Sequence, residues 1–241
     1  MSQVTGTVVG VPDDELRRVT PSLLKSADHM CPRRLKHEFE SGKDLAGRSD
    51  ARFELSNRLA EDARLAHAEL GPPTTDAFVE PSELEPEQRA VYRAAVAGYL
   101  RAFGDQVVVA DDIGRVTELT DLGVRLSGTP GLAVTDEQGN HELRVLGIGR
   151  VAAANPADRA FTVLRAVAWA ADSFTLTTVD LLDPKPVREE IDVATERGAA
   201  LDWITARVRR VESRADRART RVGADCRTCS CIPGCPALTG S

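Results

Sequence analysis

The cysteines of this chain lie near its two ends. Cys31 stands close to the N-terminus, and the other four cysteines fall within ten positions near the C-terminus. They are Cys226, Cys229, Cys231 and Cys235. Thiolates bind zinc and iron–sulfur clusters, and a spacing of two residues between cysteines lets both sulfurs reach one metal. Since nothing in the sequence indicates an oxidising compartment, the cluster predicts a metal centre, with disulfides or idle thiols as the alternative.

Length and composition favour one folded domain. The 241 residues, of which 42% are hydrophobic, are enough to bury a substantial core without disulfides. The net charge of -6 gives no overall attraction to nucleic acid, so DNA binding requires a local basic patch. We expect a cytoplasmic protein without a membrane span, because no signal peptide is visible and the longest apolar stretch, 163–171, is far shorter than the roughly 20 residues of a membrane helix.

The N-terminal region of the chain, 1–104, is predicted to be helical. Thr20 is placed as an N-cap and Pro21 as the first residue of a helix that ends near Cys31, because Pro32 disfavours its continuation. Further helices are expected over 51–70, before Gly71-Pro72-Pro73, and from Pro86 to the residue before Gly104. Buried positions are expected at Leu23, Leu24, Ala27, Met30, Phe53, Leu55, Leu59, Ala63 and either Leu65 or Ala66. His67 is a possible ligand, although a lone helical histidine is more often a surface residue or a satisfied one.

The middle region, 105–192, is predicted to form the sheet core. Strands are expected at 107–110, 124–127, 132–134, 143–148 and 174–182, with a turn at 136–140 and an apolar helix over 160–171. The last region, 193–241, combines a long helix over 194–222 with the cysteine cluster. This helix is expected to bury Leu201, Ile204, Val208 and Val211. The pattern predicts an α/β fold with one small antiparallel or mixed sheet between helices.

Two basic segments adjoin the cysteines. The first follows Cys31 and contains Arg33, Arg34 and Lys36. The second belongs to the long C-terminal helix and contains Arg207, Arg210, Arg214, Arg217 and Arg221. Both are candidates for phosphate contacts, and for the first segment a solvated helix face paired with Glu38 and Glu40 is the alternative.

Motifs at both ends of the chain resemble a known family. Thr20-Pro-Ser-Leu-Leu, Cys31-Pro-Arg-Arg-Leu and the C-terminal pattern Cys226-x2-Cys229-x5-Cys235 are similar to the iron–sulfur branch of the RecB-type PD-(D/E)xK nucleases, which includes AddB-like and CRISPR-adaptation nucleases. The resemblance implies a restriction-endonuclease-like core, with a central mixed sheet flanked by helices.

The resemblance also implies a ligand set for the metal centre. One cysteine near the N-terminus and three at the C-terminus clamp the ends of the fold around a 4Fe-4S cluster. In this sequence those positions are Cys31, Cys226, Cys229 and Cys235, and Cys231 is surplus. The alternative is a zinc site of the four C-terminal cysteines, which leaves Cys31 idle.

The catalytic positions of the family are replaced here. Such nucleases need two carboxylates and a lysine around Mg²⁺ or Mn²⁺, which activates a water and stabilises charge on the scissile phosphate. In this sequence Gly131 stands at the first acid, Gly147 at the second and Gly149 at the lysine. Asn57 stands at the histidine, and Arg165 with Trp169 at the expected glutamine and tyrosine. We therefore expect no catalytic residue.

These observations predict a catalytically inactive iron–sulfur nuclease-like protein that binds DNA, either single-stranded or at a duplex end, or supports a helicase or nuclease partner. One alternative is an active metal-dependent exonuclease whose acids have moved. Candidates for such acids are Glu142, Asp111, Asp112, Glu118, Asp121 and Asp136. Glu142-Leu-Arg144 mimics an acid-x-base pair, yet strand alternation places both on the core face with Leu146 and Ile148. A second alternative is a protein-interaction subunit that never contacts DNA.

Overall fold

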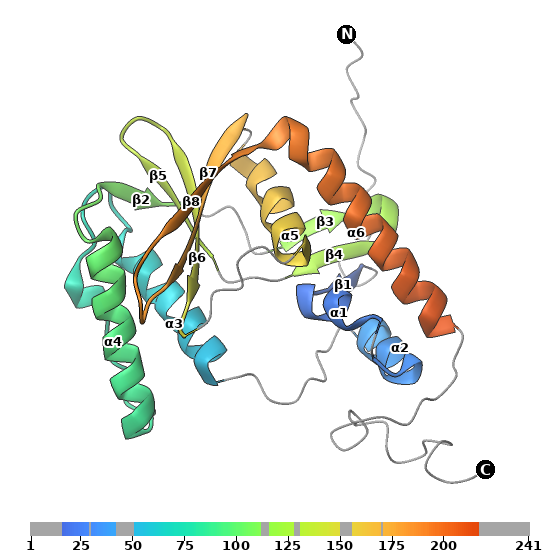
Figure 1. Ribbon diagram of the computed structural model, residues 1–241, viewed down its shortest axis with the longest axis horizontal. Coiled ribbons are helices and arrows are strands. Elements are labelled where there is room, and N and C mark those ends of the chain that lie inside the picture. Colours follow the sequence, from blue (N-terminus) through green and yellow to red (C-terminus); the bar gives the residue numbers. More distant parts are fainter. Residues whose placement is uncertain are drawn as a thin grey trace. The chain divides into compact units, whose positions relative to one another are not determined.

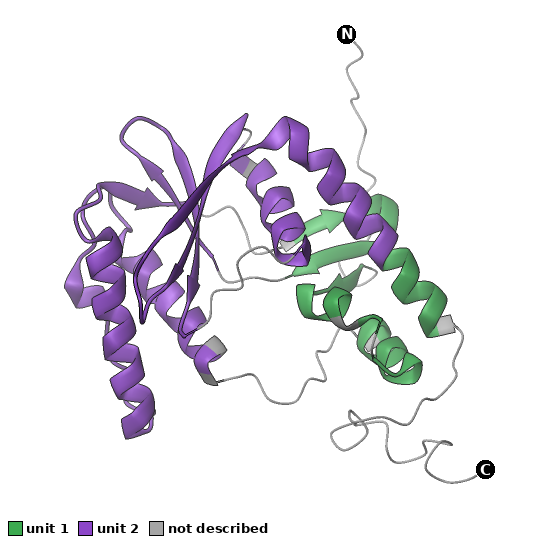
Figure 2. Ribbon diagram, viewed as in Figure 1, with its two compact units in different colours: residues 1–45, 116–127, 208–241 green, residues 46–115, 128–207 purple. Residues whose placement is uncertain are grey.

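The computed structural model describes residues 16–28, 30–41, 51–111, 116–127, 131–149, 156–169 and 171–216. The chain divides into two compact units (Figure 2). One unit comprises residues 1–45, 116–127 and 208–241, and the other comprises residues 46–115 and 128–207. Each unit has its own sheet. The fold is therefore mixed α/β with two mixed sheets flanked by helices, where the sequence predicted an α/β fold with one sheet.

The first unit joins segments that are distant in sequence. Its three-stranded sheet has the order β1 (Arg17–Val19), β4 (Val124–Ser127), β3 (Val116–Leu119). β1 runs parallel to β4, and β3 runs antiparallel to it. The short helix η2 (Thr120–Leu122) links β3 to β4. The two helices α1 (Pro21–Ser26) and α2 (Pro32–Ser41) follow β1 in the chain, and the last turns of α6 (Val193–Asp216) complete the described portion of this unit.

The start of α1 confirms the predicted cap. The Thr20 hydroxyl accepts a hydrogen bond from the Leu23 amide at 3.2 Å, which satisfies one of the free amides of the first turn. The four apolar residues expected inside are all buried. They are Leu23, Leu24, Ala27 and Met30. The helix is shorter than predicted, since it ends at Ser26, and the break before Pro32 separates α1 from α2.

The second unit is built on a five-stranded sheet (Figure 1). The strand order is β2 (Val108–Ala110), β5 (Leu132–Asp136), β6 (His141–Gly147), β7 (Ser173–Asp180), β8 (Val187–Asp192). β6 and β7 are parallel, as the intervening helix α5 (Pro156–Ala166) allows, and the other neighbouring pairs are antiparallel. The sheet is therefore mixed, and β5 and β8 run opposite to the other three strands.

Helices α3 (Ala51–Ala66) and α4 (Pro86–Phe103) pack on one face of this sheet. Their buried residues form one core with β2, β5, β6 and β7 and the residues just after β6 and β7. Those core residues include Leu59, Tyr92, Tyr99, Val134, Leu146 and Val179. The 3₁₀ helix η1 (Thr75–Ala77) lies between α3 and α4 in the chain. A second 3₁₀ helix, η3 (Val167–Trp169), follows α5, and its Trp169 contacts Phe174 of β7.

Several predicted boundaries and faces need correction. The strand at 124–127 belongs to the smaller sheet, because it pairs with β1 and β3 and with no strand of the larger sheet. The N-terminal region is not wholly helical, since β1 lies within it. Ala66 and not Leu65 is buried on α3, and Leu201 is exposed on α6 while its neighbour Ala200 is buried. The expected helix at 160–171 begins at Pro156 and becomes a 3₁₀ turn after Ala166.

No helix among the described residues combines the length and the apolar content that crossing a bilayer requires. The end of the predicted helix at 217–222 and four of the five cysteines lie outside the described residues.

Candidate functional site

Cys31 lies at the start of α2, in the first unit. The residue is half-buried, and its carbonyl accepts a hydrogen bond from the Leu35 amide at 2.8 Å, which makes Cys31 the residue that opens the helix. The end of α6 contacts the residues just before it. Arg214 donates to the Met30 carbonyl at 3.2 Å, and Arg210 pairs with Asp28 at 2.5 Å. The last described turns of the chain therefore lie against the segment that leads into Cys31.

The other predicted metal ligands are Cys226, Cys229 and Cys235, which lie outside the described residues together with the surplus Cys231. Within the described ranges, no three His, Cys, Asp or Glu side chains gather in a way that would hold a metal ion. The assignment of Cys31 as an iron–sulfur ligand remains a prediction.

Several of the basic residues proposed for DNA make contacts within the protein. Arg34 forms a buried ion pair with Glu38 at 2.7 Å, and Lys36 pairs with Glu40 at 3.6 Å. The guanidinium of Arg207 lies over the Trp203 ring, 5.4 Å from its centroid. The partners Glu38 and Glu40 are those of the alternative, yet the first pair is buried and not solvated. Arg33 is half-buried, and Arg217 and Arg221 lie outside the described residues.

Three of the positions at which the sequence predicts replaced catalytic residues lie at or next to the ends of β5 and β6, and these are glycines. Gly131 directly precedes β5, Gly147 ends β6, and Asn57 is exposed on α3. Gly149 has φ = 73°, a left-handed conformation that favours glycine over lysine. A Cβ atom at Gly149 would lie 2.6 Å from a guanidinium nitrogen of Arg52, so a side chain at this position would displace that guanidinium.

An acid that the sequence reasoning missed lies beside these glycines. Asp180, at the end of β7, accepts hydrogen bonds from the Gly149 amide at 2.8 Å and from the Leu182 amide at 3.0 Å. Both bonds end on the same carboxylate oxygen and shape the turn after β7. No local signal marked this residue, because an aspartate at a strand end is common.

A buried polar network crosses the core face of β6. Arg144 is fully buried and forms an ion pair with Glu142 at 2.8 Å. It also donates to the Tyr99 hydroxyl at 3.2 Å and to the Gln106 side-chain oxygen, and it lies over the Phe103 ring, 4.2 Å from its centroid. As predicted, Glu142 and Arg144 lie on the core face with Leu146. The sequence did not identify the partners, because they come from α4 and the segment after it.

His67 ends this network as a neutral histidine. Its Nε2 lies 2.9 Å from the Tyr99 hydroxyl. Since Arg144 can only donate, the hydroxyl accepts from Arg144 and its own proton is available to His67. Burial, followed by the Arg144 charge, lowers the pKa of His67 from 6.5 to about 4. The histidine is a buried core residue that is bonded through Nε2, while its Nδ1 has no hydrogen-bond partner among the described residues.

This pKa predicts a pH dependence of stability. Below pH 6.5 His67 becomes protonated in the unfolded chain, whereas in the folded protein it stays neutral down to about pH 4. The contribution of His67 to the free energy of unfolding is therefore present above pH 6.5 and is lost as the pH falls to about 4. We expect His67→Gln, which keeps an acceptor for Tyr99 but does not titrate, to flatten the stability profile between these values. Urea unfolding of both proteins at a series of pH values measures the effect, and parallel profiles would contradict it.

A second polar cluster involves Asp111, one of the acids considered above. Asp111 accepts hydrogen bonds from the Thr135 hydroxyl and from Trp169 Nε1, the latter at 3.0 Å. The Thr135 oxygen lies 2.7 Å from His141 Nδ1, and the His141 ring stacks on Trp169 with centroids 4.9 Å apart. Because the Thr135 proton goes to Asp111, His141 donates from Nδ1. The cluster joins Asp111, which directly follows β2, to β5, β6 and η3.

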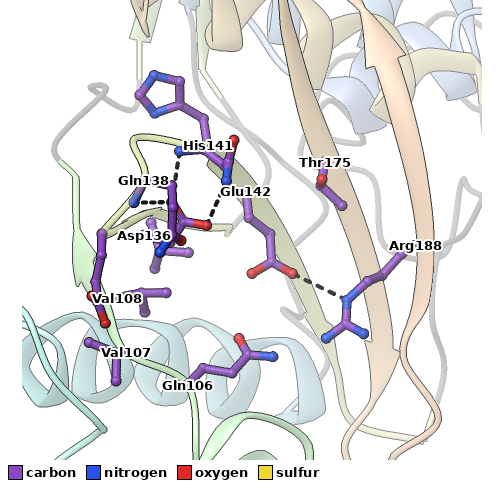
Figure 3. Close-up of a pocket in the computed structure, with 12 residues that line it drawn as sticks. Gln106, Val107, Val108, Asp136, Gln138, His141, Glu142, Thr175 and Arg188 are labelled. Atoms are coloured by element: carbon purple, nitrogen blue, oxygen red, sulfur yellow. Dashed lines mark hydrogen bonds and ion pairs between the residues drawn. The ribbon is translucent and has the colours of Figure 1, made fainter.

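A pocket of about 520 Å³ opens beside the network (Figure 3). Gln106, Glu142 and Arg188 converge on it, from the segment before β2, from β6 and from β8. Asp136 also lines the pocket, but its carboxylate is used by the β5–β6 turn, where it accepts from the Gln138 and Asn140 amides at 2.9 and 2.8 Å. Burial raises the pKa of Asp136, but the hydrogen bonds from the Asn140 side chain and from the backbone amides of the turn together hold this pKa below its ordinary value.

Comparison with known proteins gives no assignment. No protein-family model matches the chain, and no curated protein is similar to it.

Proposed function

We propose that this protein is a catalytically inactive, iron–sulfur nuclease-like module that supports a DNA-processing partner such as a helicase or nuclease. The observation that carries the proposal is the contact of the end of α6 with the segment before Cys31. It brings the last described turns of α6 to the residues just before Cys31, which supports a clamp between the two ends of the chain. The mixed sheet with helices on its faces agrees with a restriction-endonuclease-like core.

The reach of the chain permits the proposed ligand set. Cys226 follows the last residue of α6, Asp216, by ten positions, and an extended chain covers about 3.3 Å per residue. Cys31, Cys226, Cys229 and Cys235 would hold the cluster, which would cross-link the two ends of the fold.

An orphaned donor beside Cys31 fits such a centre. The Nε atom of Arg214 is buried and has no hydrogen-bond acceptor among the described residues. The same guanidinium is bonded to the carbonyl of Met30, the residue before Cys31. A buried cationic donor without an acceptor is costly, and thiolate or sulfide sulfurs of an anionic cluster would supply one.

The replaced positions support the absence of cleavage. Glycine offers neither a carboxylate for a divalent metal nor an ammonium group for the reacting phosphate, so Gly131, Gly147 and Gly149 cannot do the family's chemistry. Asp180 is close to Gly149, but its carboxylate is engaged by two backbone amides of the turn.

The ion pairs of the basic residues favour support of a partner protein over direct DNA binding. Arg34, Lys36 and Arg210 each pair with an acid of the same unit. A guanidinium that is already paired gains little from a phosphate contact, because the existing pair must first be broken. DNA binding by the module is therefore the second candidate.

The expected result is that single-stranded and double-stranded DNA stay intact when incubated with the protein in Mg²⁺ or Mn²⁺. Gel electrophoresis of end-labelled DNA measures cleavage, and fluorescence anisotropy on the same DNA measures binding across a salt series. Under partner support, binding at low salt is weak. Direct DNA binding gives instead a log–log salt slope of about -0.7 to -0.9 per phosphate contacted.

Paired variants separate these outcomes. Arg33→Ala with Lys36→Ala should flatten a genuine salt slope, while Arg93→Ala, an exposed arginine paired with Glu80, should leave it unchanged. Cleavage that disappears on replacing Glu142 or Asp111 would overturn the proposal in favour of a relocated active site.

A further inference from the structure

Two polar side chains of the pocket in the second unit, Gln106 and Glu142, are held in fixed orientations by one fully buried arginine, Arg144. Arg144 donates to the side-chain oxygen of Gln106, so that oxygen faces the arginine. The assignment is forced, because a guanidinium has no acceptor. The amide NH₂ of Gln106 is therefore the group left for the pocket, which Gln106 lines.

Glu142 is held by the same arginine. One carboxylate oxygen accepts from Arg144 Nε at 2.8 Å, and the other accepts from the Thr177 hydroxyl at 2.5 Å. Two hydrogen bonds leave lone pairs unused, since a carboxylate offers about four. Figure 3 shows the carboxylate directed toward Arg188. Glu142 thus presents a partly buried, oriented negative charge to the pocket.

Arg188 supplies the opposite charge to the pocket, and it does not form a hydrogen bond with Glu142. Its Nε lies 3.9 Å from the Glu142 oxygen, beyond hydrogen-bond distance, and half of its side chain is exposed. The pocket therefore places a carboxylate and a guanidinium side by side, each able to take a further partner. A ligand with one cationic and one anionic group close together would satisfy both.

The pocket also has an apolar side. Val107, Val108 and Val134 line it, and the last two are buried. Figure 3 shows Val107 and Val108 on the same side of the pocket as Gln106. The volume of about 520 Å³ lies within the range of small-molecule sites.

We propose that this pocket binds a small apolar α-amino acid. The ammonium group donates to Glu142, the carboxylate accepts from Arg188 and from the Gln106 amide, and the side chain packs against the three valines. This arrangement uses the three polar side chains that converge on the pocket, Gln106, Glu142 and Arg188. Stability alone does not require the Arg144–Glu142 ion pair, because apolar residues in place of a whole buried pair are often no less stable. Orienting Glu142 and Gln106 toward a ligand is a role for Arg144 beyond stability.

L-valine is the probe, and two fragments test the recognition of both charges. Isobutylamine lacks the carboxylate, and 3-methylbutanoate lacks the amine. Calorimetric titration of the full-length protein should show saturable binding of L-valine at one site and at least tenfold weaker binding of either fragment. Arg188→Ala should weaken L-valine at least tenfold, and Arg93→Ala, which removes an exposed arginine outside the pocket, should leave it unchanged.

A variant at the exposed Arg188 avoids the risk that a change at Glu142 or Arg144 unfolds the protein. Amide shifts in ¹H–¹⁵N spectra should localise the response to 106–108 and 141–142. Absence of L-valine binding to the folded wild type, or equal binding of one fragment, would overturn the proposal. Neither outcome bears on the iron–sulfur centre, since the pocket lies wholly in the second unit.

Discussion

Glu142→Ala is expected to lower the free energy of unfolding by about 3–5 kcal/mol, the typical loss when one partner of a buried ion pair is removed. Arg144 is fully buried, so its charge would remain in the core without its carboxylate partner. Urea unfolding measures the change. Arg144→Met in the Glu142→Ala background should recover some of the loss, because it removes the stranded charge.

The control for this prediction is an exposed ion pair. Arg93 pairs with Glu80, and its side chain is 70% exposed. Glu80→Ala should change the unfolding midpoint far less than Glu142→Ala, because exposed pairs are screened by water. Equal effects of the two substitutions would mean that the β6 network contributes no more than a surface pair.

Cys31→Ala is expected to remove the visible absorbance of the protein and to destabilise the fold. The proposed cluster joins Cys31 to cysteines almost 200 positions later, and closing such a long loop stabilises a fold by on the order of 3–5 kcal/mol when it is treated like a covalent cross-link. Absorbance spectra of anaerobically purified protein and thermal unfolding measure the two effects. Cys226→Ala, Cys229→Ala and Cys235→Ala should behave alike.

Cys231→Ala is the matched control, because Cys231 is surplus in the proposed ligand set. This variant should keep its colour. Metal retained in Cys31→Ala but lost in Cys231→Ala would favour a zinc site of the four C-terminal cysteines.

Capped helices and apolar strands were predictable from sequence. Thr20-Pro21 marked the start of α1, and Glu85-Pro86 marked the start of α4, where the Glu85 amide donates to Gln88 at 3.0 Å. These signals are local, so they hold whatever the tertiary structure. The strands β4, β5, β6 and β7 carry runs of apolar residues and were found for the same reason.

The strands that sequence reasoning missed are short or charged. β1 is Arg17-Arg18-Val19, and its parallel pairing with β4 joins residues more than 100 positions apart. β8 is an edge strand in which only Ile191 is buried, so its sequence lacks the usual alternation. Charged edge strands protect a sheet from further pairing, and this hides them from a pattern search.

The candidate sites were only partially predictable for a similar reason. The face of Glu142 and Arg144 follows from strand alternation, but their partners Tyr99, Gln106 and Thr177 come from other elements. The pocket depends on Arg188 of β8, a strand that was not expected. Sequence reasoning identified residue types that carry chemistry, whereas their assembly depends on tertiary pairing.

Metal analysis of the anaerobically purified protein tests the central claim most directly. Iron and acid-labile sulfide should both be present at roughly four per chain, as a 4Fe-4S cluster requires, together with less than stoichiometric zinc. One zinc per chain without sulfide, or protein that folds fully with no metal, would contradict an iron–sulfur clamp between Cys31 and the C-terminal cysteines.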